Sequence, residues 1–277
     1  MEKKTDKIKK IVKEGYAKVA TQSASCCSGS SCCGGANLAK DISKTIGYSD
    51  KEMNAVPDGA NLGLGCGNPV AIASLKEGEV VLDLGSGAGF DAFLASPKVG
   101  KTGRVIGVDM TPEMIKKARA NANKGNYTNV EFRLGEIEKL PVEDNSIDVI
   151  ISNCVINLSP DKESVFNEAF GVLKPGGRLM VSDLVLVKEL PEIIKESVEA
   201  YVGCLAGAIM KDDYLSYIKK SGFKNIEVVS ETSYPIEAMA NDITAQVVKN
   251  NLGIKQKDLK DVENSVVSIK VSALKPK

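Results

Sequence analysis

Residues 80–90 contain an acid followed by three alternating glycines, and this spacing indicates a binding site for a nucleotide-like cofactor. The apolar run before the glycines predicts a buried parallel strand that turns at once into a helix, where glycine lets a ligand approach the backbone. A dinucleotide fingerprint requires glycine at the position that Phe90 occupies. The motif residues are Asp83, Gly85, Gly87 and Gly89. The pattern therefore favours a nucleotide-like cofactor other than a dinucleotide.

Two acids narrow the class of cofactor. A carboxylate at Asp83 attracts an ammonium group and repels phosphate. Asp109 ends the next predicted strand 20 residues after Gly89, the spacing at which an acid reaches ribose hydroxyls in such folds. S-adenosylmethionine carries an ammonium, a sulfonium and a ribose but no phosphate, so it fits both acids. We assign Met110 and Asn153, which follow Asp109 and the fourth predicted strand, to the same site. The simpler alternative is a glycine-rich turn with an incidental surface acid, and the pair of strands argues against it.

The chain has seven cysteines and no histidine. Without histidine, the usual proton shuttle at neutral pH and the commonest metal ligand are both missing. An odd number of cysteines in a reducing compartment is more typical of core residues, metal ligands or redox groups than of a disulfide framework. Any chemistry must therefore use groups other than imidazole.

Cys154 is the first candidate for such chemistry. In a doubly wound sheet, ligands bind beyond the carboxyl ends of the strands, between the first strand and its neighbour on the other side, which here is the fourth. Cys154 follows the fourth predicted strand, 147–152, within two residues. We therefore expect it beside the methyl group of the cofactor. Taken alone, a buried small side chain is the commoner explanation of such a cysteine.

Cys66 and Cys204 favour a functional role for Cys154 over a purely structural one, because both lie in segments that can fold over the same edge of the sheet. Cys66 is in the glycine-rich loop 61–69, and Cys204 is in an insertion after the fifth strand. They are 88 and 50 residues from Cys154, unlike the paired cysteines of structural zinc sites. Thiolates select soft centres, so a soft acceptor with three ligands fits better. The sequence thus allows three thiols to converge.

Regular alternation of strand and helix from Val80 onward predicts an α/β fold with a doubly wound, Rossmann-like sheet. Helical spacing over 5–20 and 37–48 predicts an N-terminal helical extension, and 189–220 predicts a helical insertion or cap after strand five. We divide the chain into an extension (1–70), a cofactor domain (71–187) and an insertion with the sheet-completing C-terminal region (188–277). The predicted strands are 80–84, 105–110, 130–134, 147–152, 178–186, 225–230 and 266–273.

Charge and hydropathy exclude several classes of partner. Lys plus Arg and Asp plus Glu both number 36, so no overall field attracts nucleic acid or an anionic membrane. No apolar run approaches the roughly 18 residues of a membrane span, and the charged N-terminal segment lacks the apolar stretch of a signal peptide. We expect a cytoplasmic protein that acts on a small molecule.

Four further segments resemble the arsenite methyltransferases, a family within the class I S-adenosylmethionine-dependent methyltransferases. These strings are more specific than the glycine motif, and the similarity runs from about Tyr48 to Ala206. They are Gly47-Tyr-Ser49, the stretch from Pro57 to Pro69, Ser152-Asn-Cys-Val-Ile-Asn-Leu158 and Tyr201-Val-Gly-Cys-Leu205.

The resemblance implies a function and a set of site residues. It implies methyl transfer from S-adenosylmethionine to trivalent arsenic, as a detoxification reaction, with Cys66, Cys154 and Cys204 as the arsenic-binding cysteines. It also implies that Glu136 and Ile137, which follow the third strand, lie against the adenine. Because donation of the arsenic lone pair formally oxidises arsenic, we expect a thiol reductant, glutathione or a thioredoxin-like partner, to be required.

The chain departs from the family in two places. The additional N-terminal cysteine of the family has no single counterpart, and two vicinal pairs, Cys26-Cys27 and Cys32-Cys33, stand near its place in a predicted mobile loop, 21–35. These pairs either capture arsenic or shuttle thiol equivalents, or they are incidental or zinc-binding thiols of a disordered segment. We also expect the longer C-terminal domain of the algal members to be missing or reduced.

Two other functions stay open from the sequence. The first is methylation of a small organic acceptor such as a quinone or a sterol-like molecule, which requires a base or a metal that the motifs do not supply. The second is a non-catalytic thiol protein that sequesters arsenic or a soft metal. The complete set of acids and glycines argues against a vestigial cofactor site.

Overall fold

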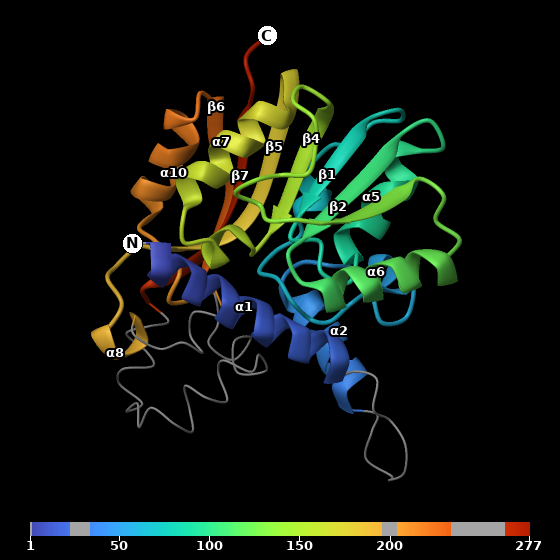
Figure 1. Cartoon of the computed structure of the whole chain (residues 1–277), viewed down its shortest axis with the longest axis horizontal. Helices are drawn as coiled ribbons and strands as arrows, with labels where there is room; N and C mark the ends of the chain where they lie inside the picture. The colour runs from blue at the N-terminus through green and yellow to red at the C-terminus, as the bar shows by residue number, and fades with distance from the viewer. Residues whose placement is uncertain (1, 23–33, 196–203, 234–263) are drawn as a thin grey trace.

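The computed structural model describes residues 2–22, 34–195, 204–233 and 264–277, and these residues build one seven-stranded sheet (Figure 1). The strand order is β3-β2-β1-β4-β5-β7-β6. The first five strands are parallel, and β7 runs antiparallel to both of its neighbours. The strands are β1 (Val80–Leu84), β2 (Arg104–Asp109), β3 (Val130–Leu134), β4 (Ile147–Asn153), β5 (Leu173–Leu186), β6 (Lys224–Ser233) and β7 (Val266–Leu274). The predicted doubly wound sheet is confirmed, including the pairing of β1 with β4.

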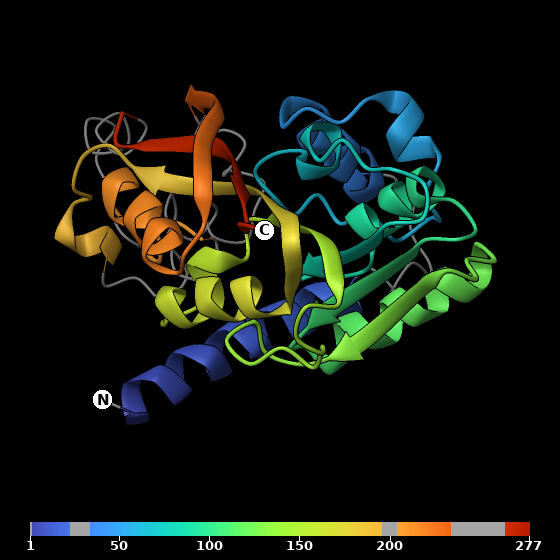
Figure 2. The same ribbon diagram turned by 90° about the horizontal axis from the view of Figure 1, so that it is seen from above.

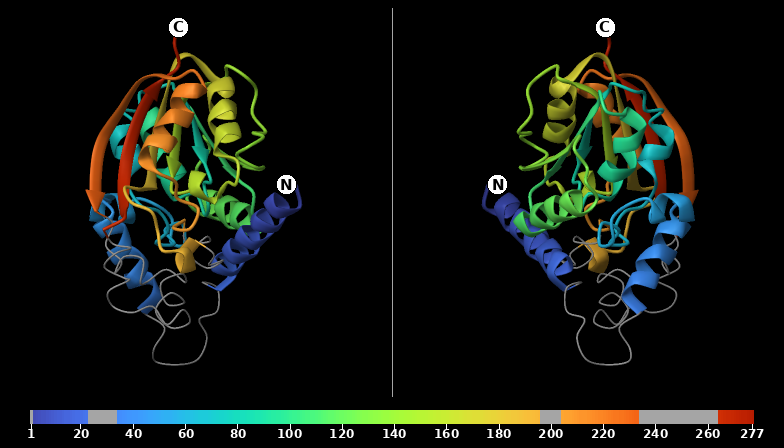
Figure 3. Two further views of the ribbon diagram at one scale, coloured as in Figure 1. Left: turned by 90° about the vertical axis from the view of Figure 1, so that its left-hand side faces the viewer. Right: turned by 90° about the vertical axis from the view of Figure 1, so that its right-hand side faces the viewer.

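Helices lie on both sides of this sheet, and two helices of the N-terminal extension lie at one end of it (Figures 2 and 3). One face packs against α4, α5 and α6, and the other face packs against α7 and α10. The helices are α1 (Glu2–Gln22), α2 (Gly34–Thr45), α3 (Asp50–Asn54), α4 (Pro69–Ile72), α5 (Phe90–Val99), α6 (Pro112–Lys124), η1 (Ile156–Leu158), α7 (Lys162–Val172), α8 (Glu192–Lys195) and α10 (Lys211–Lys220).

The alternation of side chains along β1 explains why both faces are covered. Val81 belongs to the core on one face, whereas Leu82 and Leu84 belong to the core on the other, and all three are fully buried. Each such apolar side chain contributes about 1.5–3 kcal/mol when it is removed from water. A strand buried on both faces has few places for a polar side chain, so the buried Asp83 between these leucines stands out.

Local signals set the ends of the elements near the site. α6 begins after Thr111 with Pro112 at its first position and ends at Gly125, as predicted. α2 ends at Thr45, earlier than predicted, and Gly47 follows with φ +104°. The predicted mobile loop 21–35 lies mostly outside the described residues.

β5 differs from its prediction at its start. The turn signal of residues 174–177 predicts a strand from Arg178, but β5 begins at Leu173. Leu173 pairs with Ile147 and Arg178 pairs with Val149, so the intervening residues form a bulge within the strand. Gly176, with φ +83°, gives the backbone the freedom for that bulge.

The helix α1 runs below the carboxyl ends of the parallel strands (Figure 1). It packs against α6, and its Val12 side chain is fully buried. Lys9 forms ion pairs with Glu136 (2.7 Å) and Glu138 (3.2 Å), which hold the helix to the segment after β3. Among the described residues, no helix is long and apolar enough to cross a membrane.

Candidate active site

A cavity opens at the carboxyl ends of β1, β2 and β4, the place where the topology predicts ligand binding. It encloses about 1370 Å³, including solvent space at its mouth. Asp83 lies at the end of β1, Asp109 ends β2 and Asn153 ends β4 in its wall. Lys9 and Tyr16 of α1 line the opposite side. The cavity therefore combines strand ends with a helix that sequence reasoning treated only as an extension.

Asp83 presents a buried carboxylate to this cavity. The residue is 2 % exposed, and its Oδ2 atom has no hydrogen-bond partner among the residues that the structure describes. Burial raises the pKa of Asp83 well above its usual value, and the charges of Asp91 and Asp109 raise it further, while a backbone hydrogen bond from Ala92 opposes them. A buried acid without a partner is costly. A ligand with a positively charged donor at this point removes that cost.

The three predicted glycines occupy three different environments. Gly85 has φ +64°, and a side chain there would collide with Val155. Gly87 has φ +51° and faces open space in the cavity wall. Gly89 caps α5 with φ +95°, and a side chain there would come within 2.7 Å of Phe93. Gly85 and Gly87 thus line the cavity, whereas Gly89 shapes the turn without lining it.

Asp109 is held by backbone amides and by the Thr111 side chain. Its Oδ2 accepts a hydrogen bond from the Gly87 amide (3.0 Å), and its Oδ1 accepts one from the Thr111 amide (2.8 Å). Burial raises the pKa of Asp109, and these backbone donors oppose the shift. Met110 lies beside it in the cavity wall. The arrangement aims one carboxylate at the glycine turn, which suits a ligand with hydroxyl groups.

Only one of the two residues predicted to lie against the adenine, Glu136 and Ile137, lines the cavity. Ile137 lines the cavity, but Glu136 does not, and its side chain is 52 % exposed in an ion pair with Lys9. Glu138, which the sequence analysis did not select, lines the cavity instead and accepts a hydrogen bond from the Ser159 hydroxyl (2.6 Å). The backbone turns after β3, so alternate acids point in different directions.

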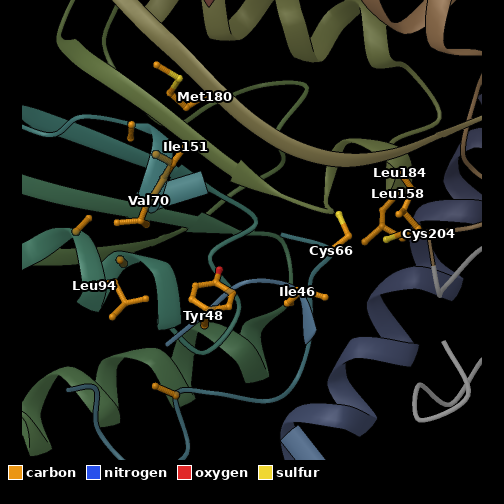
Figure 4. Close-up of a cluster of buried hydrophobic side chains, with 14 of the residues drawn as sticks. Ile46, Tyr48, Cys66, Val70, Leu94, Ile151, Leu158, Met180, Leu184 and Cys204 are labelled. Atoms are coloured by element: carbon orange, nitrogen blue, oxygen red, sulfur yellow. The ribbon is translucent and has the colours of Figure 1, made fainter. Parts of the chain in front are cut away.

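The three cysteines come together at one side of the cavity. Cys154 and Cys204 line it, and Cys66 is buried beside them. The Cys204 thiol donates to the Cys154 carbonyl oxygen (2.8 Å), and the sulfurs of Cys66 and Cys154 lie within 4.8 Å of each other. Figure 4 shows Cys66 near Cys204, with Leu158 and Leu184 beside Cys204. Thiols from three distant parts of the chain therefore meet, as the sequence allowed.

Cys154 and Cys204 have left-handed backbones, with φ +56° and +64°. This conformation is unusual for a residue with a side chain and is found at functional sites more often than elsewhere. Burial raises the pKa of Cys66. For Cys154, the hydrogen bond from Cys204 lowers the pKa, but Cys66 and burial together raise it well above its usual value. Both thiols are therefore protonated at neutral pH until a ligand displaces the protons.

Asn153 joins the thiol cluster to the acids of the cavity. Its Oδ1 accepts a hydrogen bond from the Cys66 amide (3.0 Å), and its Nδ2 donates to the Gly67 carbonyl (2.9 Å) and to Asp91 (3.0 Å). Tyr48 donates a further hydrogen bond to Asp91 (2.6 Å). Burial raises the pKa of Asp91 to about 6, and the bonds from Tyr48 and Asn153 oppose the shift. The role predicted for Asn153 thus widens from lining the cavity to holding the Cys66 loop.

Asp183 is a site residue that the sequence analysis missed. It lies in β5, is fully buried, and has a carboxylate oxygen within 4.8 Å of the sulfurs of Cys66 and Cys154, which are equally close to each other. The available signal was an acid inside an otherwise apolar predicted strand. Cys26, Cys27, Cys32 and Cys33 lie outside the described residues.

Comparisons with known proteins agree with this geometry. A family model described as "Methyltransferase domain" matches residues 75–222. An arsenite methyltransferase of Halobacterium salinarum is 47% identical over 230 residues, which cover 80% of this chain and 59% of that protein. The crystal structure of an arsenic(III) S-adenosylmethionine methyltransferase from Chlamydomonas reinhardtii is 32% identical, with a TM-score of 0.61, over 87% of this chain and 73% of that one.

The chain belongs to the arsenite methyltransferase family. The human arsenite methyltransferase is 40% identical over 168 residues, which cover 57% of this chain and 44% of that protein. The chain thus spans 44% to 59% of the length of these two curated arsenite methyltransferases. The methyltransferase domain match includes Cys154 and Cys204 but begins after Cys66. In this family member, the loop before β1 supplies the third thiol of the cluster.

Proposed function

We propose that the protein transfers a methyl group from S-adenosylmethionine to trivalent arsenic bound by Cys66, Cys154 and Cys204. The observation that supports the proposal is that Cys154 and Cys204 line one cavity, while the sulfur of the buried Cys66 lies within 4.8 Å of the Cys154 sulfur. Thiolates select soft, thiophilic centres. The names of the relatives, which include several arsenite methyltransferases, support the same acceptor.

The chemical groups that line the cavity suit S-adenosylmethionine. The unpartnered Oδ2 of Asp83 suits an ammonium group, the turn at Gly87 leaves open space, and Asp109 suits ribose hydroxyls. Met110 and Ile137 supply apolar wall for an adenine. When bound, S-adenosylmethionine supplies the electrophilic methyl group. The protein's own residues hold that ligand and the acceptor in register, and positioning is a large source of rate acceleration.

The three thiols prepare the acceptor without a separate base. Each thiol replaces one hydroxide of arsenite, so one arsenic–sulfur bond forms, one arsenic–oxygen bond breaks, and the thiol proton leaves with the hydroxide as water. Arsenic held by three sulfurs keeps a lone pair that needs no deprotonation. The absence of histidine from the sequence is therefore compatible with the reaction. Asn153 keeps Cys66 in place for this step through two backbone contacts.

Donation of the lone pair leaves arsenic formally pentavalent, and two of the thiols restore the trivalent state. Two arsenic–sulfur bonds break and one sulfur–sulfur bond forms, so the two sulfurs lose two electrons and arsenic keeps them as a lone pair. A water molecule then adds to arsenic and releases a proton. An external dithiol, or two molecules of a monothiol, must then reduce the disulfide. We infer that glutathione or a thioredoxin-like protein supplies these equivalents and that turnover stops after about one methyl transfer without them.

The test is a direct assay of product. The purified protein is incubated with arsenite, S-adenosylmethionine and glutathione, and methylated arsenic is measured by mass spectrometry. We expect methylated product from the native chain and none from the Cys154→Ser variant, which should still bind S-adenosylmethionine because Asp83 and Asp109 are unchanged. Product formation by Cys154→Ser at the native rate, or no product from a native chain that binds the cofactor, contradicts the proposal.

A further inference from the structure

Asp183 is a buried carboxylate beside two of the thiols, and the methyl transfer proposed above does not use it. It has no exposed surface, and its carboxylate lies within 4.8 Å of the Cys66 and Cys154 sulfurs. Trivalent arsenic bound to three sulfurs has its three bonds and needs no oxygen ligand. The carboxylate therefore requires an explanation of its own.

The fold supplies hydrogen-bond donors to both oxygens of the Asp183 carboxylate. Oδ1 accepts hydrogen bonds from Asn157 (2.9 Å) and from the Leu184 amide (2.9 Å). Oδ2 accepts one from the Tyr214 hydroxyl (3.1 Å). A carboxylate has about four lone-pair sites. The backbone amide of Asn157 contributes a further hydrogen bond that favours the ionised carboxylate, so a cation at Oδ2 has to compete with the donors of the fold.

The spacing of the three atoms is close to that of a tetrahedral metal site. Zinc binds sulfur at about 2.3 Å and carboxylate oxygen at about 2.0–2.2 Å, so tetrahedral ligands lie about 3.8 Å apart for two sulfurs and about 3.6 Å for sulfur and oxygen. The three ligand atoms lie within 4.8 Å of one another, so modest inward movements complete this geometry. The Cys204 thiol, which donates to the Cys154 carbonyl (2.8 Å), is not among these three and has to turn towards them to become the fourth ligand.

The charge around the cluster favours an added cation. Lys162 is 8 % exposed, and its ammonium group donates to the carbonyls of Asn157 (3.4 Å) and Ser159 (2.9 Å) rather than to Asp183. Burial lowers the pKa of Lys162 to about 8, although the charge of Asp183 opposes the shift. When a cation displaces the thiol protons, the site holds a carboxylate and three thiolates, and one buried ammonium does not balance these charges. A doubly charged ion ligated by the same groups compensates most of that negative charge.

We propose that Cys66, Cys154 and Asp183 bind a divalent thiophilic cation of the zinc type, with Cys204 as the fourth ligand. Each thiol releases its proton to solvent when the cation binds, and no electron is transferred. Because the cation and arsenic share the thiols, the cation excludes arsenite from the site, and this clause rests on the proposed function. Asp183 distinguishes the two ligands, since only the divalent cation uses it.

The experiment uses cobalt(II) as a spectroscopic probe in the full chain. Cys26, Cys27, Cys32 and Cys33 are replaced by serine, so that only the three clustered thiols remain. The reduced, metal-free protein is titrated with cobalt(II) without oxygen. We expect one cobalt per chain, a thiolate-to-cobalt charge-transfer band, the visible bands of tetrahedral cobalt, and displacement by zinc and by arsenite. Asp183→Asn should weaken cobalt binding about tenfold or more, whereas the exposed control Asp58→Asn should leave it unchanged.

Three results overturn the proposal: no charge-transfer band at one equivalent, equal cobalt affinity in a folded Asp183→Asn variant, or an unchanged band in Cys66→Ser. The last variant keeps the test valid if Asp183→Asn does not fold, as judged by circular dichroism. Cobalt binding is measured without arsenic or cofactor. Cobalt binding without methyl transfer therefore refutes the proposed function alone, and methyl transfer without cobalt binding refutes this inference alone.

Discussion

Replacing Asp83 by asparagine should make the free protein more stable and its cofactor binding weaker. Asparagine keeps the size and shape of the side chain but removes the negative charge. In the free protein, that charge lies buried with Oδ2 unpartnered among the described residues, near Asp91 and Asp109. With the cofactor bound, the same charge would hold an ammonium group. One substitution therefore has opposite effects on two measurable quantities.

The magnitudes follow from the environment of the carboxylate. A hydrogen bond to a charged group contributes about 1.5–3 kcal/mol, and 1.4 kcal/mol corresponds to a tenfold change in affinity. The dissociation constant for S-adenosylmethionine should therefore rise about 10- to 150-fold. For stability, burial raises the folded-state pKa of Asp83 well above its unfolded value of about 3.9, so the folded protein binds more protons between these values. The native chain should lose stability relative to Asp83→Asn as the pH rises through this range.

The assay combines calorimetry with denaturation. Isothermal titration gives the affinity for S-adenosylmethionine, and urea denaturation gives the free energy of unfolding from about pH 4 to pH 8. The variant should be more stable than the native chain at pH 7, and the difference should shrink towards pH 4. Asp58→Asn, whose side chain is 99 % exposed and pairs with Lys124 at the surface, is the matched control. It should leave the cofactor affinity unchanged and should change the free energy of unfolding by no more than about 1 kcal/mol. Unchanged cofactor affinity in a folded Asp83→Asn protein refutes the role of Asp83.

Three further predictions test the surroundings of the site. Gly85→Ala should lower the free energy of unfolding by about 1–3 kcal/mol in urea denaturation, because the added carbon meets Val155 at a backbone φ of +64°, and an unchanged midpoint contradicts this. Tyr48→Phe should destabilise by about 1–3 kcal/mol, and more at pH 8 than at pH 5, because its hydroxyl stabilises the ionised form of Asp91, whose pKa is about 6; an equal loss at both pH values counts against it. Lys9→Ala should cost about 0.2–1 kcal/mol per lost ion pair, and the cost should fall in 1 M salt; a salt-independent loss indicates a packing effect instead.

Periodicity and turn chemistry predicted most of the fold. Buried strands with intervening helices allow few sheet orders, so the pairing of β1 with β4 followed from the alternation alone. That pairing placed Cys154 at the switch point. The bulge in β5 was not predictable, because residues 174–177 signal a turn in either arrangement. Only the pairing of Leu173 with Ile147 distinguishes a bulge from a strand start.

The site was predictable where a residue type carries its own chemistry. An acid before alternating glycines and thiols near strand ends identified the part of the cavity wall that contains Asp83, Cys154 and Cys204. The positioning contacts were not predictable, since the bond from Asn153 to the Cys66 amide joins residues 87 positions apart. The inward direction of Glu138 and the outward direction of Glu136 depend on a backbone turn that the sequence does not specify. The sequence did not predict Asp183 as a site residue, because its role depends on neighbours that are distant in the sequence.

The most direct test of the account is arsenic K-edge X-ray absorption of the protein loaded with one equivalent of arsenite. The four cysteines at positions 26, 27, 32 and 33 are replaced by serine for this measurement, so that only Cys66, Cys154 and Cys204 can bind. The account predicts three sulfur neighbours and no oxygen neighbour around arsenic. Two sulfurs with an oxygen, or no stoichiometric binding by the folded protein, would contradict the three-thiol site.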